Sequence, residues 1–198
     1  MEIGKIKEKL KERGFVEGED FEIQLFKGGK IFRICFNFCV LAFNYTKEIN
    51  LVTLLRSCEI FGAKEFITVG VKPEITEKAS VGAKKWIEVK HFDNFEDAYK
   101  YLKEKGYKLV GVEILKEAKN TFEIKEYPKK CCFIIGSEKE GGLSKEVIEK
   151  CDLIVRIPQY GITGSLNTAT AGSIIVYDYV LKNIKVDLLE PKERNYRV

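Results

Sequence analysis

The feature that most constrains the fold is the segment 131–182, in which two short apolar runs are each followed by a loop and a helical pattern. The first run, CCFII at 131–135, precedes a glycine-bearing loop, and the second, LIVRI at 153–157, stops at Pro158. Such continuous apolar runs are typical of strands buried in a parallel sheet, whose ligands bind beyond the carboxyl ends of the strands. Three polar side chains that suit chemistry stand in these loops: Glu138, Ser165 and Asn167.

The rest of the chain alternates in the same way between strand and helix patterns. We expect helices over 3–13, 50–61, 95–105 and 144–150, a last helix opened by 165–167, and strands over 21–25, 31–36, 38–43, 66–69 and 108–114. Residues 71–89 show weak periodicity, and 116–129 are predicted to be a polar connection with an extended piece at 121–124. This order predicts an α/β fold, a parallel sheet with flanking helices, preceded by a short N-terminal helix and a β-hairpin.

The expected organisation is one main domain with two short appendages. They are the helix and hairpin extension at 1–36, the domain proper at 37–184 and a basic tail at 185–198. A chain of 198 residues is long enough for a sizeable core, and no apolar run is long enough to cross a membrane. The first residues form a charged helix pattern instead of a signal peptide, so we expect a cytoplasmic protein.

Composition leaves nucleic acid as a permitted partner and gives no support to a metal centre. The formal net charge is +4, which is mildly basic. The six cysteines form no Cys-x-x-Cys pair and His91 is the only histidine, so the ligand spacing of a zinc site is missing. The thiols are expected to be reduced and to fill the core.

Several short motifs occur in a fixed order. Gly136-x-Glu138-x-x-Gly141 follows the first apolar run, and it is neither a Walker loop nor a dinucleotide fingerprint. Upstream, the string NLVTLLRSCEIFG at 50–62 places Arg56 six positions after Asn50 and Gly62 six further on. By spacing alone, Arg56 is either a solvated helix residue or a functional one.

Together with Ile157-Pro158 and Ser165-Leu166-Asn167, these motifs resemble the SpoU/TrmH-type branch of the SPOUT methyltransferases over residues 38–183. The resemblance implies an S-adenosylmethionine-dependent RNA ribose 2′-O-methyltransferase. It implies a deep trefoil knot near the C-terminus and a homodimer in which the last helix takes part. The implied catalytic residues are Arg56, supplied by the partner subunit, with Asn50, Glu138, Ser165 and Asn167. The implied cofactor contacts, mostly through backbone groups, are Val112, Glu113, Ile135, Gly136, Ser137, Ile157 and Leu166.

The segment 81–86 is most similar to that of enzymes that methylate a guanosine ribose in the tRNA D-loop. Lys84, Lys85 and Trp86 place two cations beside an aromatic ring, a combination that suits phosphates and bases of RNA, although Trp86 equally suits packing. DNA and membranes are not expected as partners. The alternatives are an rRNA 2′-O-methyltransferase, a catalytically silent knotted RNA-binding protein, a SPOUT enzyme acting on a base nitrogen, and a nucleotide-binding α/β protein unrelated to RNA.

Overall fold

A central, mostly parallel sheet organises the molecule. The computed structural model describes residues 3–29, 31–44, 48–137 and 141–185. Within them the strands follow the spatial order β4 (Glu88–Phe92), β3 (Ala63–Gly70), β2 (Ile31–Asn44), β7 (Cys131–Ile135), β5 (Lys108–Val112), β8 (Leu153–Arg156) and β6 (Lys119–Asn120). All neighbours along this path run parallel. The expected parallel α/β sheet with flanking helices is confirmed.

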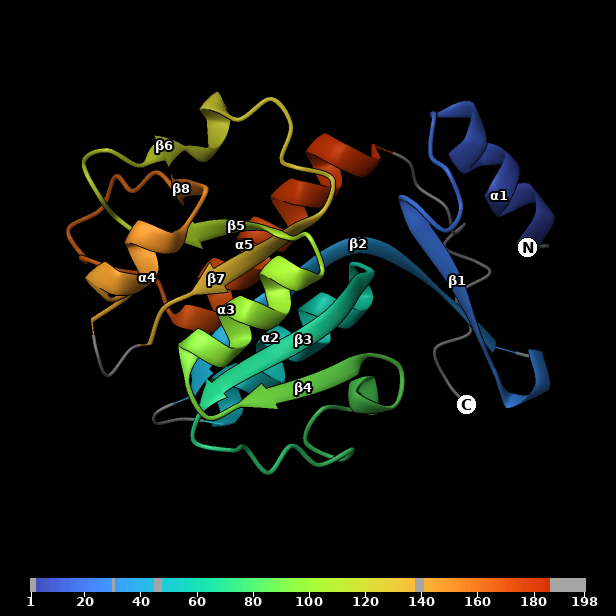
Figure 1. Ribbon diagram of the computed structural model, residues 1–198, viewed down its shortest axis with the longest axis horizontal. Helices are drawn as coiled ribbons and strands as arrows, with labels where there is room; N and C mark the ends of the chain where they lie inside the picture. Colours follow the sequence, from blue (N-terminus) through green and yellow to red (C-terminus); the bar gives the residue numbers. More distant parts are fainter. Residues whose placement is uncertain (1–2, 30, 45–47, 138–140, 186–198) are drawn as a thin grey trace.

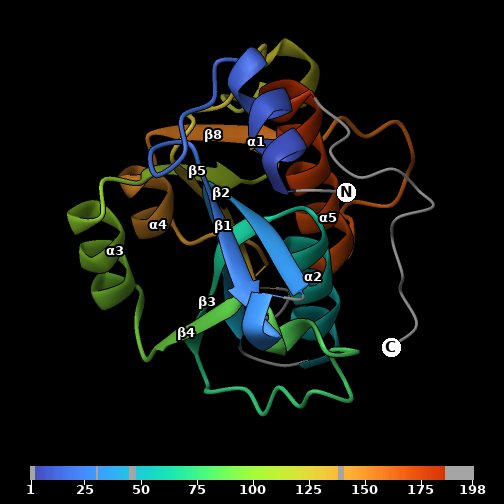
Figure 2. The same cartoon turned by 90° about the vertical axis from the view of Figure 1, so that its right-hand side faces the viewer.

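Helices cover both faces of this sheet, giving three layers (Figures 1 and 2). Successive residues of a strand point to opposite faces. Phe38 and Val40 of β2 pack with α2 (Glu48–Ile60) and α5 (Thr168–Tyr179). Cys39 and Leu41 pack on the other side with α3 (Phe95–Glu104) and α4 (Lys145–Lys150). A strand that is apolar on both faces therefore lies inside the sheet, as the continuous apolar runs predict.

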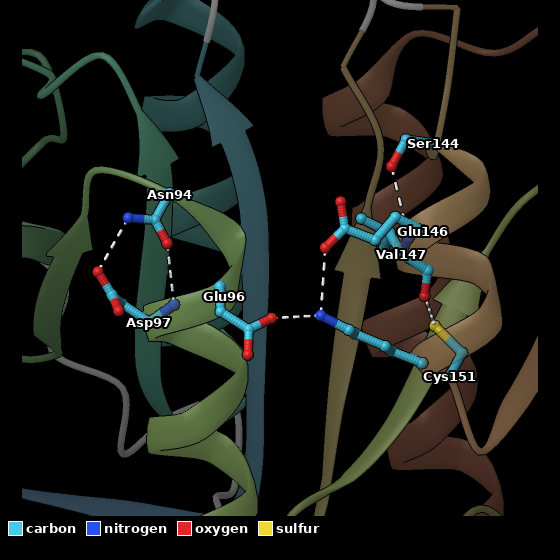
Figure 3. A network of polar contacts seen from close by, with 8 residues as sticks. Asn94, Glu96, Asp97, Ser144, Glu146, Val147 and Cys151 are labelled. Carbon is cyan, nitrogen blue, oxygen red and sulfur yellow. Dashed lines mark hydrogen bonds and ion pairs between the residues drawn. The ribbon is translucent and has the colours of Figure 1, made fainter.

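Capping residues fix where α3 and α4 begin, and an ion pair joins these two helices (Figure 3). The side chain of Asn94 accepts from the Asp97 amide at 3.0 Å, and the Ser144 hydroxyl accepts from the Val147 amide at 3.4 Å. Lys150 of α4 donates both to Glu96 of α3 and, at 3.1 Å, to Glu146. Ser144 begins its helix where the sequence predicts because a serine there satisfies an otherwise free amide.

The strand β2 is longer than the sequence suggests. We expected separate strands at 31–36 and 38–43, but one strand runs through Asn37 with only a register shift between Phe36 and Cys39. Its first part pairs antiparallel with β1 (Phe21–Phe26), and its second part pairs with β3 and β7. The prediction of two separate strands was wrong because the one polar residue between them, Asn37, does not end the strand. Its side-chain amide donates a hydrogen bond to the carbonyl of Glu19, so the polar group can be accommodated within β2. The domain boundary expected after residue 36 thus falls inside β2.

Three further elements differ from expectation. The strand β4 begins with the last two residues of the weakly periodic segment 71–89 and continues to Phe92, where no strand was expected, and it forms the edge of the sheet. The piece 121–124, expected to be extended, is instead a 3-10 turn, η3 (Thr121–Glu123), because the Glu123 carboxylate accepts from the Asn120 amide at 2.6 Å and closes a capping box. The last helix continues beyond α5 into a π-helical turn, η4 (Val180–Ile184).

The remaining elements complete the outline of the chain. The N-terminal helix α1 (Ile3–Glu12) buries Ile6 and Leu10 in the core that contains α2 and α5. No helix among the described residues is both long and apolar enough to cross a membrane. The expected tail at 185–198 lies, after Lys185, outside the described residues.

Candidate active site

A cavity of about 230 Å³ opens beyond the carboxyl ends of three adjacent strands, β5, β7 and β8. The sheet register sets Val112 beside both Ile135 and Val155, so these strands end at one level. Ser165 lines this cavity. So do all seven residues expected to contact a cofactor, which are Val112, Glu113, Ile135, Gly136, Ser137, Ile157 and Leu166. The structure therefore gathers residues from three loops that are far apart in sequence.

The loop after β7 closes tightly on itself. The amide of Gly142 donates to the carbonyl of Ser137 at 3.0 Å, and the Ser137 amide donates back at 3.3 Å. A Cβ atom added to Gly136 would lie 2.4 Å from the carbonyl carbon of Gly142, which no folded backbone allows. Gly136 is thus required for the close approach of two backbone segments. Glu138, expected among the catalytic residues, lies outside the described residues.

The carboxylate of Glu113 ties this loop to the end of β5. Its Oε2 atom accepts from the Leu143 amide at 2.6 Å, and its Oε1 atom accepts from the Ile114 amide at 2.8 Å. A Cβ atom on Gly142 would collide with the same carboxylate. Sequence reasoning named Glu113 for its backbone, but hydrogen bonds of an ionised carboxylate to amides are strong, so its side chain shapes the cavity.

Arg156 is a lining residue that sequence reasoning missed. It is the last residue of β8, and it is the only lysine or arginine among the described residues that line the cavity. Its Nε atom donates to Oδ1 of Asn120 at 2.8 Å, which orients the guanidinium. The sequence signal that could have identified Arg156 is its position as a charged residue at the end of the otherwise apolar strand β8. The cavity consequently carries one cationic and one anionic side chain, Arg156 and Glu113.

A second cluster joins the beginnings of α2 and α5. The side-chain amide of Asn167 donates to Oδ1 of Asn50 at 3.1 Å, and its own Oδ1 accepts from the amides of Ala169 and Thr170 at 2.9 and 3.2 Å. The N-termini of both helices therefore lie side by side, next to the cavity that Ser165 lines.

The same two helices stay in contact further along. The hydroxyls of Ser57 on α2 and Ser173 on α5 lie 2.7 Å apart. A Cβ atom on Gly172 would collide with the side chain of Leu54. The close packing of α2 on α5 therefore holds the two asparagines in place.

Arg56 stands apart from this cluster within one chain. It is exposed on α2 and does not line the cavity. The two asparagines and Ser165 are thus brought together by the fold, whereas Arg56 is not brought to the cavity of its own subunit.

The three residues expected to contact RNA are engaged locally. Lys84 Nζ donates to the carbonyl of Ile75 at 2.7 Å, and Lys85 pairs with Glu77 at 2.8 Å. The ring of Trp86 makes an edge contact with a nearby phenylalanine ring, that of Phe26, with centroids 5.1 Å apart. None of the three lines the cavity at the strand ends. Within the described residues, no group of three or more histidine, cysteine, aspartate or glutamate side chains is placed to hold a metal ion.

These features define a class of protein, a parallel α/β protein whose small-ligand cavity is built from three loops beyond the strand ends. Known proteins narrow the class. The SpoU rRNA Methylase family matches residues 29–177. The tRNA (guanosine(18)-2′-O)-methyltransferase of Thermus thermophilus is 29% identical over 154 residues, 76% of this chain and 78% of that protein. The enzyme of the same name from Aquifex aeolicus is 31% identical over 70% of this chain and 66% of its own.

Solved structures agree with these relatives. The crystal structure of the Aquifex aeolicus TrmH/SpoU tRNA modifying enzyme superposes with a TM-score of 0.69 at 28% identity, over 79% of this chain and 83% of that one. The AdoMet-bound rRNA methyltransferase from Sinorhizobium meliloti has a TM-score of 0.66 at 25% identity, over 73% and 56% of the two chains. The chain belongs to the SpoU rRNA Methylase family. The resemblance seen in its motifs is confirmed, and the protein is an SpoU-type RNA 2′-O-methyltransferase that uses S-adenosylmethionine.

Proposed function

We propose that the protein methylates the ribose 2′-hydroxyl of a guanosine in the D-loop of tRNA, in the cytoplasm. The observation that carries the proposal is the convergence of all seven expected cofactor residues and Ser165 on one cavity. The tRNA substrate is supported by the relatives, several of which are named tRNA (guanosine(18)-2′-O)-methyltransferases. An rRNA 2′-O-methyltransferase is the alternative assignment of the substrate.

The charges and the glycines of the cavity lining suit the cofactor. S-adenosylmethionine is elongated, carries both positive and negative groups, and supplies an electrophilic methyl group when bound. Glu113 and Arg156 offer complementary charges, and Gly136 and Gly142 let the loop backbone approach a ligand without side chains in between. We propose that backbone groups hold the adenosine part, with Val112 and Glu113 beside it. The residues that supply these groups are Ile135, Gly136, Ser137, Ile157 and Leu166.

The polar cluster next to the cavity would receive the RNA. Helix N-termini favour anions, and the beginnings of α2 and α5 lie together here, so a backbone phosphate is stabilised at this place. Asn50 and Asn167 orient the ribose, and Ser165 hydrogen-bonds the substrate. Glu138 is proposed to hold the loop or to pair with Arg56.

Arg56 is proposed to act in the active site of the partner subunit. A guanidinium stays protonated at neutral pH, so Arg56 would grip the phosphate and polarise the 2′-hydroxyl instead of acting as a free base. Its exposed position on α2, away from the cavity of its own chain, supports this arrangement. The proposal requires a homodimer.

The dimer and the knot are parts of the same proposal. Apolar side chains are exposed on α2, α5 and η4, which pack against one another, and this supports an interface there: Ile60, Ile174, Tyr177 and Leu181. We also propose that residues 37–184 form the catalytic unit and contain a deep trefoil knot. Double-jump refolding tests the knot, because chains unfolded long enough to untie should refold more slowly than briefly unfolded ones.

The deciding experiment is to incubate the purified protein with labelled S-adenosylmethionine and unmodified total tRNA, then to digest the RNA and identify the nucleoside. We expect 2′-O-methylguanosine from the D-loop. No label in tRNA, but label in rRNA, would favour the rRNA enzyme. RNA binding without methylation of either RNA, or failure to bind S-adenosylmethionine, would overturn the proposal.

A further inference from the structure

The short strand β6 places a fixed partner beside one side chain of the cavity at the strand ends, that of Arg156. Among the described strands, β6 pairs only with β8, beside which it lies in Figure 1. The register sets Asn120 of β6 next to Arg156, the last residue of β8. Nε of Arg156 donates to Oδ1 of Asn120 at 2.8 Å, and its Nη1 has a longer contact, 3.5 Å, with the carbonyl of Leu115.

The orientation of the Asn120 side chain is set by a second contact. The Glu123 carboxylate accepts from the backbone amide of Asn120 at 2.6 Å and from its side-chain Nδ2 at 2.9 Å. These hydrogen bonds, the backbone one foremost, lower the pKa of Glu123, so its carboxylate is ionised at neutral pH and can only accept. Nδ2 of Asn120 therefore faces Glu123, which leaves Oδ1 to face Arg156.

This arrangement keeps the tip of the Arg156 guanidinium available to a ligand. Asn120 occupies Nε, and Nη1 has only the long contact with Leu115. Within the described part of the chain, Nη2 makes no hydrogen bond, and no other lysine or arginine lines the cavity. The two Nη groups of a guanidinium lie in one plane, and such a pair of donors matches the two oxygens of a carboxylate.

We propose that Arg156 binds the α-carboxylate of S-adenosylmethionine and so selects cofactors that carry this group. The carboxylate is the only anionic group of this cofactor, because its sulfonium and amino groups are positive and its adenine and ribose are uncharged. Asn120 acts as a positioning residue, since it holds the guanidinium and does not itself line the cavity. The inference rests on the proposed placement of the cofactor in this cavity.

The anionic side chain of the lining favours the same orientation of the cofactor. Both oxygens of Glu113 already accept from backbone amides, those of Leu143 and Ile114. A ligand carboxylate is repelled by Glu113 and attracted by Arg156, whereas the positive groups of the ligand have the opposite preference. The two side chains together therefore fix which way round the methionine part of the cofactor lies.

Calorimetry on the full-length protein, without RNA, tests the inference with S-adenosylmethionine and its decarboxylated form, which lacks only the carboxylate. The wild type should bind S-adenosylmethionine about thirtyfold more tightly, the size expected for one charge-assisted paired contact. In Arg156→Gln this affinity should fall to that of the decarboxylated form, whose own affinity should stay at the wild-type value and so report a folded cavity. Arg156→Lys should keep only part of the preference, because an ammonium cannot make the paired contact.

Two further variants separate positioning from charge. Asn120→Ala should reduce the preference for S-adenosylmethionine and leave the affinity for the decarboxylated form unchanged, which a merely structural role of Asn120 would not do. Lys119→Gln is the matched control, because it removes one positive charge from an exposed position of the same strand, outside the cavity. This variant should keep the full preference.

The outcomes that contradict the inference are distinct from those that contradict the proposed function. Equal affinity of the wild type for the two ligands, full preference in Arg156→Gln, or equal weakening of both ligands in that variant would overturn the role of Arg156 alone. Failure of the wild type to bind either ligand would overturn both this role and the proposed function.

Discussion

Asn167 has two separable roles at the start of α5. Its carbonyl oxygen caps the helix by accepting from Ala169 and Thr170, and its amide group donates to Asn50. The cap is a matter of stability, and the contact with Asn50 aligns the proposed RNA site. Replacement by alanine removes both the cap and the contact with Asn50, whereas replacement by aspartate removes only the contact with Asn50.

We therefore predict that Asn167→Ala lowers the free energy of unfolding by about 1 kcal/mol, the usual value of an N-cap. Asn167→Asp keeps the acceptor and should retain wild-type stability, but it cannot donate to Asn50 and brings a negative charge to the phosphate site, so methyl transfer should fall. Urea unfolding and single-turnover methylation measure the two effects. Equal destabilisation by both variants would contradict the assignment of the cap.

Cys151 provides a pH-dependent prediction. Burial raises the pKa of its thiol to about 12, and the thiol also donates to the Val147 carbonyl at 3.2 Å. Because the thiolate is the reactive form, alkylation of Cys151 at pH 8 should be about a thousandfold slower than that of a free thiol, and it should accelerate as the pH rises toward 12. Mass spectrometry of the maleimide-treated native protein checks this.

The denatured protein is the control, since all six cysteines should then react quickly. Burial also raises the pKa values of Cys39, Cys58 and Cys131. Rapid labelling of Cys151 in the folded protein at pH 8 would show that its surroundings are more open than described.

At the scale of single residues, motifs predicted the site better than composition did. Residues such as Gly136 and Ser165 were found because their spacing follows a pattern. Arg156 was missed because its role depends on Asn120, a partner 36 positions away that no local pattern indicates. The sequence left open whether Trp86 packs inside the protein or contacts RNA. Its edge contact with Phe26 could not be predicted, because the two residues are 60 positions apart and only the fold brings them together.

At the scale of elements, the described ends of the connection between β7 and α4 are held close together. The carboxyl end of β7 enters it at Gly136, where a side chain would meet the backbone of Gly142. The loop is then anchored by Glu113 of the neighbouring connection. The two described ends of the loop thus depend on a close backbone approach and on one carboxylate.

Gly136→Ala should displace this loop and reduce methyl transfer about a hundredfold, the cost expected of a misplacement near 1 Å. S-adenosylmethionine binding should weaken in parallel, as measured by calorimetry. Gly161→Ala is the matched control, because a Cβ there meets nothing within 4 Å. Wild-type cofactor affinity in a folded Gly136→Ala protein would show that the cofactor binds elsewhere.

Strands and helices with strong periodicity were predictable, and elements set by distant partners were not. β7 was predicted at its observed bounds because CCFII is continuously apolar. β4 was missed because its residues, EVKHF, are mostly polar, and only pairing with β3 makes them a strand. The division of β2 was wrong for the opposite reason, since a local polar residue suggested a break that the pairing overrides.

At the scale of the whole molecule, the proposed active site, in which Arg56 comes from the partner subunit, predicts that two inactive variants can complement each other in one dimer. Arg56→Ala and Gly136→Ala should each be nearly inactive alone. In a mixed dimer, the intact cavity of the first variant meets the intact Arg56 of the second, so mixing and reannealing should restore about a quarter of wild-type activity by random pairing.

Sedimentation confirms that both variants form dimers before the mixture is interpreted. No recovery after proven subunit exchange would place Arg56 in the site of its own chain.

The order of strands in the sheet could not have been predicted with the motifs, because it depends on pairs such as Phe38 with Cys131, which are distant in sequence.

The continuity of β2 has a practical consequence. The β1–β2 tip near Lys27 is carried by the same strand that lies between β3 and β7 in the middle of the sheet. A domain fused through a flexible linker takes many orientations and averages out in electron micrographs. A domain inserted at this tip would instead keep a fixed orientation relative to the sheet. The turn is therefore the place to insert a fiducial domain for imaging this small enzyme on its RNA.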